Sequence, residues 1–339
     1  MTLVGCEDPS TADPLQPEPR ENTRASGDGA RKLVSVVIPC YNEEGNIAEL
    51  ARRLKMVFDD EPAYDFEVIL VENGSRDATW SKIAEACAAD ARFKSVQLSR
   101  NFQTDGGLTA GMSFATGDAA VLMCADLQDP PELIHEFLGK WAEGYENVYQ
   151  IITKRRGSSL PRRAASQAFY WLINKLTGGT FPRNASDFRL IDRRVYATVN
   201  EMGEHNRFLR GMVFWTGFAS IGVQHERPER FAGESKAGTL RMIELAVRSI
   251  LSYSNVPLRL ITWIGVSVSA VSFMLLIYEV IRAVFYGVPF AGFGTIVGVM
   301  LLMFGFLFTM LGVVAEYVGL IYEEVKQRPN FVVRDKIGL

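Results

Sequence analysis

The sequence predicts an α/β fold with a mostly parallel sheet, followed by two C-terminal transmembrane helices. From Leu33 onward, short apolar runs alternate with segments of helical period, which is typical of parallel strands joined by helices. Two long apolar segments lie in the last quarter of the chain, and about 20 apolar residues are enough for a helix to cross a bilayer. At 339 residues, the chain has room for about two domains.

The composition argues against several classes of protein. The chain has 36 Lys and Arg against 39 Asp and Glu, a net charge of −3, whereas a nucleic-acid-binding protein shows a basic excess. Its four cysteines form no Cys-x-x-Cys pair and its three histidines show no metal-ligand spacing, so neither a zinc site nor a disulfide-stapled fold is indicated. Carboxylates are therefore the expected carriers of any chemistry.

The elements are predicted in order along the chain. Residues 1–32 contain four prolines among polar residues, which predicts a flexible tail, and they lack the basic start and apolar core of a signal peptide. Residues 33–238 are predicted to form the sheet domain. Its strands are expected around 35–38, 66–71, 95–98 and 119–123. One helical face after the first strand carries Ile47, Leu50, Leu54 and Phe58.

Polar loops follow these predicted strands, at 39–44, 72–77, 99–105 and 126–132. In parallel sheets, ligands bind at the carboxyl ends of the strands. These loops are therefore the first candidates for a functional site.

Two basic, aromatic-rich segments are candidates for helices at a membrane surface. They are an interfacial helix at about 160–177 and an amphipathic juxtamembrane helix at 239–258. Taken alone, each segment is better explained as an ordinary core-facing helix with a charged outer side.

A transmembrane hairpin is predicted at 259–320. Leu260–Ile281 has Glu279 as its only charged residue, and Phe290–Val314 has none. Both segments are therefore predicted to be membrane-spanning helices. Basic residues precede and follow the pair but are absent from the linker at 283–289, so both ends are expected to face the cytoplasm. Residues 321–339 then form a cytoplasmic C-terminal tail. A buried helical pair in a large soluble core is the alternative.

Several loop motifs occur together, in order along the chain: Pro-Cys-Tyr-Asn-Glu-Glu at 39–44, Glu-Asn-Gly-Ser-Arg-Asp at 72–77, Ser-Arg-Asn-Phe at 99–102, Leu-Thr-Ala-Gly at 108–111, Asp-Leu-Gln-Asp-Pro-Pro-Glu at 126–132 and Ser-Asp-Phe-Arg-Leu at 186–190. With them the chain resembles the inverting glycosyltransferases of family 2, which have the GT-A fold. Among these it resembles the polyprenyl-phosphate enzymes related to dolichyl-phosphate mannose synthase and bactoprenol glucosyltransferase. The resemblance runs from about residue 33 to 329.

The resemblance implies a membrane-bound, metal-dependent enzyme that moves a hexose from a UDP- or GDP-sugar to a polyprenyl phosphate. It implies a homo-oligomer in the lipid bilayer of the bacterial inner membrane, with the catalytic domain in the cytoplasm. Two alternatives stay open. A processive polysaccharide synthase would be expected to carry a Gln-x-x-Arg-Trp type motif and more membrane helices, and a catalytically inactive glycan- or lipid-binding relative would lack transfer altogether.

The family pattern makes Asp126 and Gln128 the candidate ligands for Mg²⁺ or Mn²⁺, and it places Asp126 in catalysis as well. A hard cation held by carboxylate and amide oxygens would neutralise the departing diphosphate. Where the family usually has an acidic residue, this chain has Cys124, a soft ligand that is expected to pack rather than bind. The alternative is a turn that caps the next helix, which suits Asp129.

The resemblance implies a nucleotide pocket formed by Pro39, Tyr41, Glu43, Glu72 and Asn73, with Asp126 at its edge. The Glu72-Asn73 pair replaces the usual Asp-Asp, and an amide both donates and accepts where a carboxylate only accepts, so base contacts are expected to be rearranged. Asn-Gly at 73–74 is also a strong turn dipeptide in any protein.

On the acceptor side, the resemblance makes Asp187 the catalytic residue, orienting the phosphate or the metal or acting as an auxiliary base. Its alternative is a loop aspartate paired with Arg183 or Arg189.

The residues expected to bind phosphate or acceptor are Arg155, Arg163, Arg189, Arg230, Ser235 and Lys236. Ala237 stands where the family commonly has an aromatic residue. For the arginines near the interfacial helix, attraction to anionic lipid head groups is an alternative role.

Overall fold

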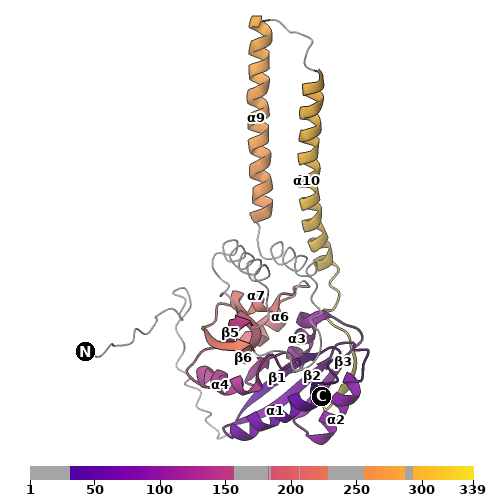
Figure 1. The fold of residues 1–339 in the computed structure, drawn as a ribbon, viewed down its shortest axis with the longest axis vertical. Coiled ribbons are helices and arrows are strands. Elements are labelled where there is room, and N and C mark those ends of the chain that lie inside the picture. The colour runs from indigo at the N-terminus through magenta and orange to yellow at the C-terminus, as the bar shows by residue number, and fades with distance from the viewer. Residues whose placement is uncertain (1–30, 156–181, 183–184, 206, 228–255, 287–292) are drawn as a thin grey trace, which may run out of the picture. The chain divides into compact units, whose positions relative to one another are not determined.

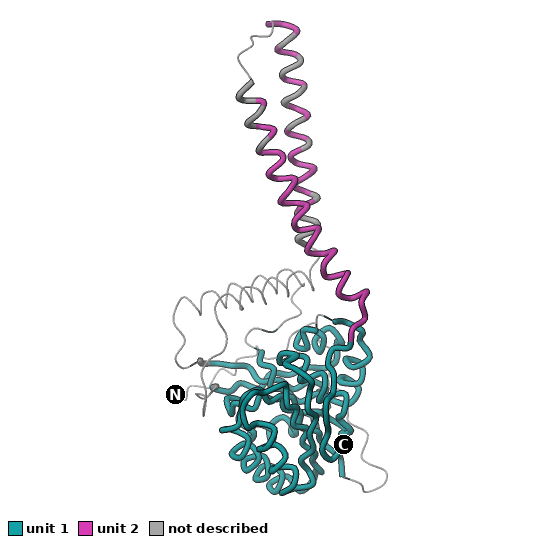
Figure 2. The backbone as a smooth tube through the Cα atoms, turned by 90° about the vertical axis from the view of Figure 1, so that its right-hand side faces the viewer, with its two compact units in different colours: residues 1–238, 329–339 teal, residues 239–328 magenta. Residues whose placement is uncertain are grey.

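The computed structural model describes residues 31–155, 182, 185–205, 207–227, 256–286 and 293–339. The predicted tail at 1–32, apart from its last two residues, lies outside the described residues, as do the interfacial helix at 160–177 and most of the juxtamembrane helix at 239–258. The chain divides into two compact units, residues 1–238 with 329–339 and residues 239–328 (Figure 2).

The first unit is built on a sheet whose described strands lie in the order β7-β5-β6-β4-β1-β2-β3-β8. Their bounds are β1 Lys32–Cys40, β2 Tyr64–Glu72, β3 Phe93–Leu98, β4 Ala119–Leu122, β5 Asn147–Arg155, β6 Ala185–Asp192, β7 Ser220–Arg227 and β8 Val333–Ile337. Strand β1 pairs in parallel with β2 and β4, and β2 pairs in parallel with β3. Strand β6 pairs antiparallel to β4, and β8 pairs antiparallel to β3. The four predicted strands and the α/β class are confirmed.

Helices cover both faces of this sheet (Figure 1). On one face lie α1 Ile47–Asp60, α2 Thr79–Ala89 and α4 Ile134–Ala142, the last preceded by the short helix η1 Pro131–Leu133. On the other lie α3 Gln103–Phe114, α6 Arg193–Glu201 and α7 Leu209–Trp215. The four residues predicted to share a face of α1 are all buried, which confirms that helix.

Alternation along β1 explains why it lies inside the sheet. Val34, Val36 and Ile38 belong to the core under α1, and Val37 belongs to the core under α3. A strand buried on both faces needs a continuous apolar run, and Val34–Ile38 supplies one, interrupted only by Ser35. The chain leaves β1 toward β2 on one side, while β4 flanks β1 on the other. A crevice forms at such a switch point, outside the carboxyl ends of the strands.

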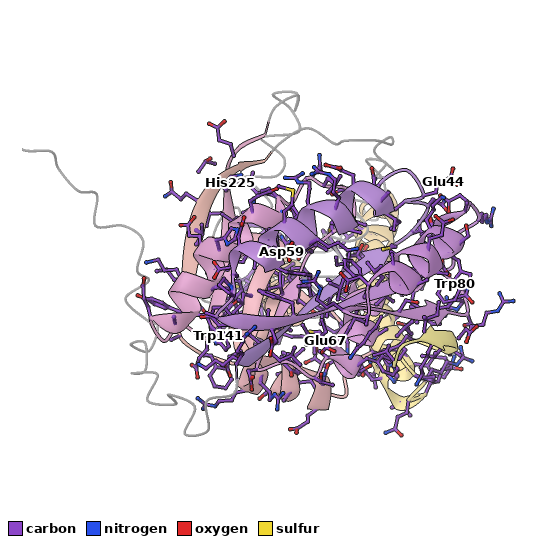
Figure 3. All side chains as sticks on the ribbon, turned by 90° about the horizontal axis from the view of Figure 1, so that it is seen from below. Glu44, Asp59, Glu67, Trp80, Trp141 and His225 are labelled. Carbon is purple, nitrogen blue, oxygen red and sulfur yellow. The ribbon has the colours of Figure 1, made fainter. Side chains whose placement is uncertain are left out.

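A buried carboxylate joins the strands well away from those carboxyl ends. Glu67 of β2 accepts hydrogen bonds from Ser35 Oγ at 2.6 Å, Thr116 N at 2.8 Å and Lys94 Nζ at 2.7 Å; Figure 3 labels Glu67. Burial raises the pKa of Glu67, but the hydrogen bonds from Lys94, Ser35 and Thr116 outweigh this and leave it lowered. With its lone pairs used in this way, Glu67 has a structural role.

The C-terminal segment is not the tail that the sequence predicts. Val333–Ile337 forms β8 and extends the sheet beyond β3, with Ile337 against the core and the Lys336 ammonium 4.5 Å from the centre of the Phe114 ring. The run Val-Arg-Asp-Lys-Ile carries three charges in five residues and gives no apolar strand signal. An edge strand tolerates such charges because one of its sides faces solvent.

The second unit contains two long helices, α9 Val256–Tyr286 and α10 Phe293–Val325. Within the described residues, one segment is long and apolar enough to cross a membrane, Leu302–Val325. It ends beyond the predicted Phe290–Val314 because α10 continues past Val314. The two helices exist, but a pair of transmembrane spans is not confirmed and stays a prediction.

The stability of the sheet unit should respond differently to alanine at two helical glycines. A Cβ at Gly111 of α3 would lie 2.2 Å from Val37 Cγ1 and 3.0 Å from Val71 Cγ2, so Gly111→Ala should cost roughly 1–3 kcal/mol by overpacking. Gly139 of α4 has no atom within 4 Å of such a Cβ, so Gly139→Ala should be neutral or stabilising by up to about 1 kcal/mol. Denaturant unfolding of both variants measures this, and equal effects would contradict the close approach of α3 to β1.

Candidate active site

The loops after β1 and β2 are joined by hydrogen bonds between backbone and side chains. Asn42 N donates to Ser75 Oγ at 3.0 Å, and Arg76 N donates to Asn42 Oδ1 at 2.9 Å. Asn42 has φ 52°, the left-handed region that asparagine tolerates better than most residues. Glu43 of the same loop accepts from Asn46 Nδ2 at 2.6 Å, so its carboxylate holds the start of α1.

Asn73 connects the end of β2 to the loop after β3. Its side chain is 3% exposed, its Oδ1 accepts from Phe102 N at 2.9 Å, and its Nδ2 donates to Gln103 O at 2.7 Å. The amide thus uses both of its hydrogen-bonding functions on backbone, which an aspartate could not do. Asn73 is therefore placed to hold the loops that surround a ligand.

A cavity of about 330 Å³ lies at the carboxyl ends of β1, β2 and β3. Tyr41 and Glu72, two predicted nucleotide-binding residues, line it. Glu72 is 2% exposed and accepts a hydrogen bond from Ser75 N. Gly74 has φ +72°, and a Cβ there would lie 2.5 Å from the Arg100 carbonyl carbon, so glycine is required where these two loops meet.

The loop after β4 is held by its own aspartates. Asp126 is 8% exposed and its Oδ1 accepts from Gln128 N at 3.2 Å. Asp129 accepts from Cys124 N at 3.1 Å within the loop. The residue at the cap position of helix η1 is Pro130, which Asp129 precedes, so the alternative in which Asp129 caps the next helix stays a prediction.

The loop offers oxygen ligands suited to a hard cation. The Asp126 carboxylate and the Gln128 amide lie two residues apart in one turn, and oxygens of this kind are what Mg²⁺ and Mn²⁺ prefer. The part of the chain that the structure describes has no group of three or more His, Cys, Asp or Glu side chains able to hold a metal. The residues therefore fit a cation that takes its remaining ligands from a bound diphosphate and water.

Asp187 lies on strand β6 and is paired with Arg210 of α7. Arg210 Nε and Nη2 donate to the two carboxylate oxygens at 2.9 and 2.7 Å, a bidentate geometry that fixes the carboxylate in orientation. The side chain of Asp187 is 36% exposed and that of Arg210 is 17% exposed. The alternative predicted from sequence, pairing with Arg183 or Arg189, missed this partner because 23 residues separate Asp187 from Arg210.

Asp105, at the start of α3, is a second carboxylate beside Asp187, and the sequence reasoning assigned it no role. Burial raises the pKa of Asp105 to about 7, with a further contribution from the charge of Asp187. Arg210, a hydrogen bond from Leu209 N and Arg189 partly offset this rise. Asp105 ends the predicted polar loop 99–105, but only the folded sheet brings it near β6 and α7.

Arg189 is in the interior rather than at a surface that a lipid could reach. It is 1% exposed, its Nη2 donates to Ser186 O at 2.8 Å, and its guanidinium lies 5.4 Å from the centre of the Phe214 ring. Burial lowers its pKa to about 10. Its charge acts on Asp187 and Asp105, so it is placed to tune these carboxylates.

The other predicted phosphate-binding residues are not brought together by the described structure. Arg155 is the last residue of β5, and Arg163, Arg230, Ser235 and Lys236 lie outside the described residues. Pro39 lies near the end of β1. The roles assigned to these residues stay predictions.

The raised pKa of Asp105 predicts a pH-dependent stability with a definite sign. The folded state holds this proton more tightly than the unfolded state, so stability from Asp105 is lost as the pH rises from the ordinary aspartate pKa of 3.8 through the raised pKa of about 7. Asp105→Asn removes this loss, so the variant should gain stability relative to the unsubstituted protein between pH 4 and pH 8. Chemical unfolding across this range tests it. Parallel curves for the two proteins would contradict the raised pKa of Asp105.

Comparison with known proteins identifies the family of the chain. The family model described as "Glycosyl transferase family 2" matches residues 35–216. The glycosyltransferase YkcC of Bacillus subtilis, named as uncharacterized, is 38% identical over 305 residues, which cover 90% of this chain and 94% of that protein. The uncharacterized glycosyltransferase sll0501 of Synechocystis is 36% identical over 306 residues, covering 90% and 96%.

A third relative has a more specific name. The SfII prophage-derived bactoprenol glucosyl transferase of Shigella flexneri is 33% identical over 301 residues, covering 89% of this chain and 97% of that protein. The family model spans more than half of the chain, and all three relatives align along nearly its whole length. The protein is therefore a glycosyltransferase that belongs to glycosyl transferase family 2.

Proposed function

We propose that the protein is an inverting enzyme of the membrane that transfers a hexose from a UDP- or GDP-sugar to a polyprenyl phosphate. The observation that carries this is the strand order, which puts the Tyr41–Glu72 cavity, the Asp126 loop and Asp187 on neighbouring strands of one sheet. The name of the Shigella relative supports the acceptor class. The proposed location is the cytoplasmic face of the bacterial inner membrane.

The strand order supports one orientation of the donor along the edge of the sheet. The cavity lies over β1, β2 and β3, whereas Asp126 follows β4, on the other side of β1. We assign the nucleoside to the cavity and the diphosphate and sugar to the β4 side. Asp187, on the next strand β6, then lies on the sugar side, where the acceptor must arrive.

The acceptor needs positioning more than activation. The second pKa of a phosphate monoester is near 6, so its oxygen is already ionised at neutral pH. Asp187, held by two hydrogen bonds from Arg210, is a rigid group suited to orienting that phosphate or the sugar, or to acting as an auxiliary base. The acceptor oxygen forms the new bond to the anomeric carbon as the bond to the diphosphate oxygen breaks.

Charge on the leaving group has to be compensated. Asp126 and Gln128 would hold Mg²⁺ or Mn²⁺, which when bound neutralises the negative charge that builds up on the nucleoside diphosphate. Asp126 is only 8% exposed, so its carboxylate acts where water screens it little.

The membrane contacts belong to the proposal as well. Leu302–Val325 is the described segment suited to spanning, and α9 is proposed as its partner in a hairpin with both ends in the cytoplasm. A homo-oligomer is part of the same proposal.

The reaction class can be tested with the purified full-length protein, undecaprenyl phosphate, Mg²⁺ or Mn²⁺ and a panel of radiolabelled UDP- and GDP-sugars. Label entering the organic phase from one donor would establish transfer and identify the sugar. If the folded protein binds a donor but transfers no label, it is an inactive binding relative, and the proposed function is wrong.

Replacing Asp126 should remove activity without unfolding the protein. Asp126→Ala is expected to lower transfer at least about 100-fold, the loss typical when a group that stabilises developing charge is removed. Glu132→Ala is a matched control, since the Glu132 side chain is 52% exposed and pairs with Arg53 at the surface. Initial rates with and without added Mn²⁺ measure both variants, and a fully active Asp126→Ala protein would exclude the metal assignment.

Asp187 should act in turnover rather than in donor binding. Asp187→Asn keeps the size of the side chain but loses the charge that pairs with Arg210, so kcat should fall about 100-fold while the KM for the donor changes less than threefold. Steady-state kinetics at saturating acceptor separate the two constants. A raised donor KM at unchanged kcat would place Asp187 in donor binding instead.

A further inference from the structure

The edge strand β8 contains an irregularity opposite the end of β3. Leu98 of β3 pairs with Val333, and the preceding residue, Gln97, pairs with Asp335. One step along β3 thus corresponds to two steps along β8, and Arg334 is the extra residue. Bulges of this kind turn a side chain out of the regular alternation and are frequent beside active sites.

The bulge places Arg334 at the cavity. Arg334 lines it together with Tyr41, Glu72 and Arg100, which come from the ends of β1 and β2 and from the loop after β3. The C-terminal strand therefore supplies one wall of the cavity that the proposed function assigns to the nucleoside.

The charged group of Arg334 makes no polar interaction within the described part of the fold. It is exposed, and within the described residues its guanidinium has no hydrogen-bond or ion-pair partner. Its neighbours along β8 do have structural contacts, since Val333 packs against the core under α3 and Lys336 lies over the Phe114 ring. Arg334 is thus the residue of β8 that lines the cavity while its guanidinium has no partner within the described residues.

Arg334 lies too far across the sheet to contact a diphosphate bound beside Asp126. Strand β8 is four strands away from β4, after which Asp126 comes. At about 4.8 Å between strands, this is about 19 Å across the sheet. A diphosphate beside Asp126 is out of reach, and the group facing Arg334 is the far end of the nucleotide, its base.

We propose that Arg334, delivered by the C-terminal strand, determines base specificity by donating hydrogen bonds to a carbonyl oxygen on the donor's base. A guanidinium has donors and no acceptor. It pairs with O4 of uracil or O6 of guanine, both of which accept hydrogen bonds. Cytosine and adenine carry an amino group at the corresponding position, which a guanidinium leaves unpaired. The assignment rests on the proposed function, because it takes the cavity as the nucleoside site.

The test measures binding of UDP, GDP, CDP and ADP, without acceptor, to the full-length protein by calorimetry. The unsubstituted protein should bind UDP or GDP at least tenfold more tightly than CDP and ADP. Arg334→Gln should weaken the favoured nucleotide about tenfold and abolish the preference, because it removes charge-assisted hydrogen bonds. Arg334→Lys should retain only part of the preference, since an ammonium lacks the planar fork of donors. Lys336→Gln, two residues along the same strand, is the control and should bind like the unsubstituted protein.

Three results would overturn the assignment. The first is that the unsubstituted protein binds no nucleoside diphosphate. The second is that folded Arg334→Gln keeps the selectivity of the unsubstituted protein. The third is that Arg334→Gln loses the same affinity for all four nucleotides, which would indicate a phosphate contact. The outcome is separable from that of the transfer assay. Base-selective binding that depends on Arg334 in a protein that transfers no sugar would refute the proposed function alone, and transfer with unchanged selectivity in Arg334→Gln would refute this inference alone.

Discussion

The burial of β1 between β2 and β4 is the constraint on which the rest of the sheet unit depends. A parallel strand with helices on both faces must be apolar on both, and the run from Val34 to Ile38 meets this requirement with Ser35 bonded to Glu67. Because β1 pairs in parallel with both β2 and β4, the loops after these three strands lie at the same edge of the sheet. The cavity and the Asp126 loop both follow from that placement.

Much of the polar chemistry at this edge serves to hold the loops in place. Asn73 and Asp129 both form hydrogen bonds to backbone groups of these loops. Three residues after β1, β3 and β4 lie in the left-handed region. These residues are Asn42 at φ 52°, Gln103 at φ 64° and Leu127 at φ 57°. Conformations of this sort are costly for residues other than glycine and persist where surrounding contacts enforce them, as around binding sites. The side chains left to face a ligand are consequently few, and their positions are rigid.

The electrostatics around Asp187 depend on four residues from three elements. Asp105 comes from α3, Asp187 and Arg189 from β6, and Arg210 from α7. Two carboxylates near one another in a half-buried site raise each other's cost of ionisation, and the two arginines compensate it. The ion pair to Arg210 fixes Asp187, while the protonation of Asp105 responds to pH near neutrality. A carboxylate held by an ion pair and a carboxyl group with a raised pKa thus lie side by side in one cluster.

The amino-acid sequence by itself determined the strands, the buried face of α1, the polar loops at the strand ends and the family. The periodicity of apolar residues, the turn residues and the order of the motifs are local signals, so they can be recognised in the sequence without knowledge of the fold. Only the tertiary structure decided which distant residues meet. It places Arg210 beside Asp187, Asp105 beside both, and Arg334 at the cavity. Each of these residues is separated from its neighbours in the fold by tens to hundreds of residues along the chain. The charged strand β8 has no apolar signal of its own and exists because β3 offers it an unpaired edge. Contacts of this kind depend on strand order and on a bulge, and neither has a local pattern in the sequence.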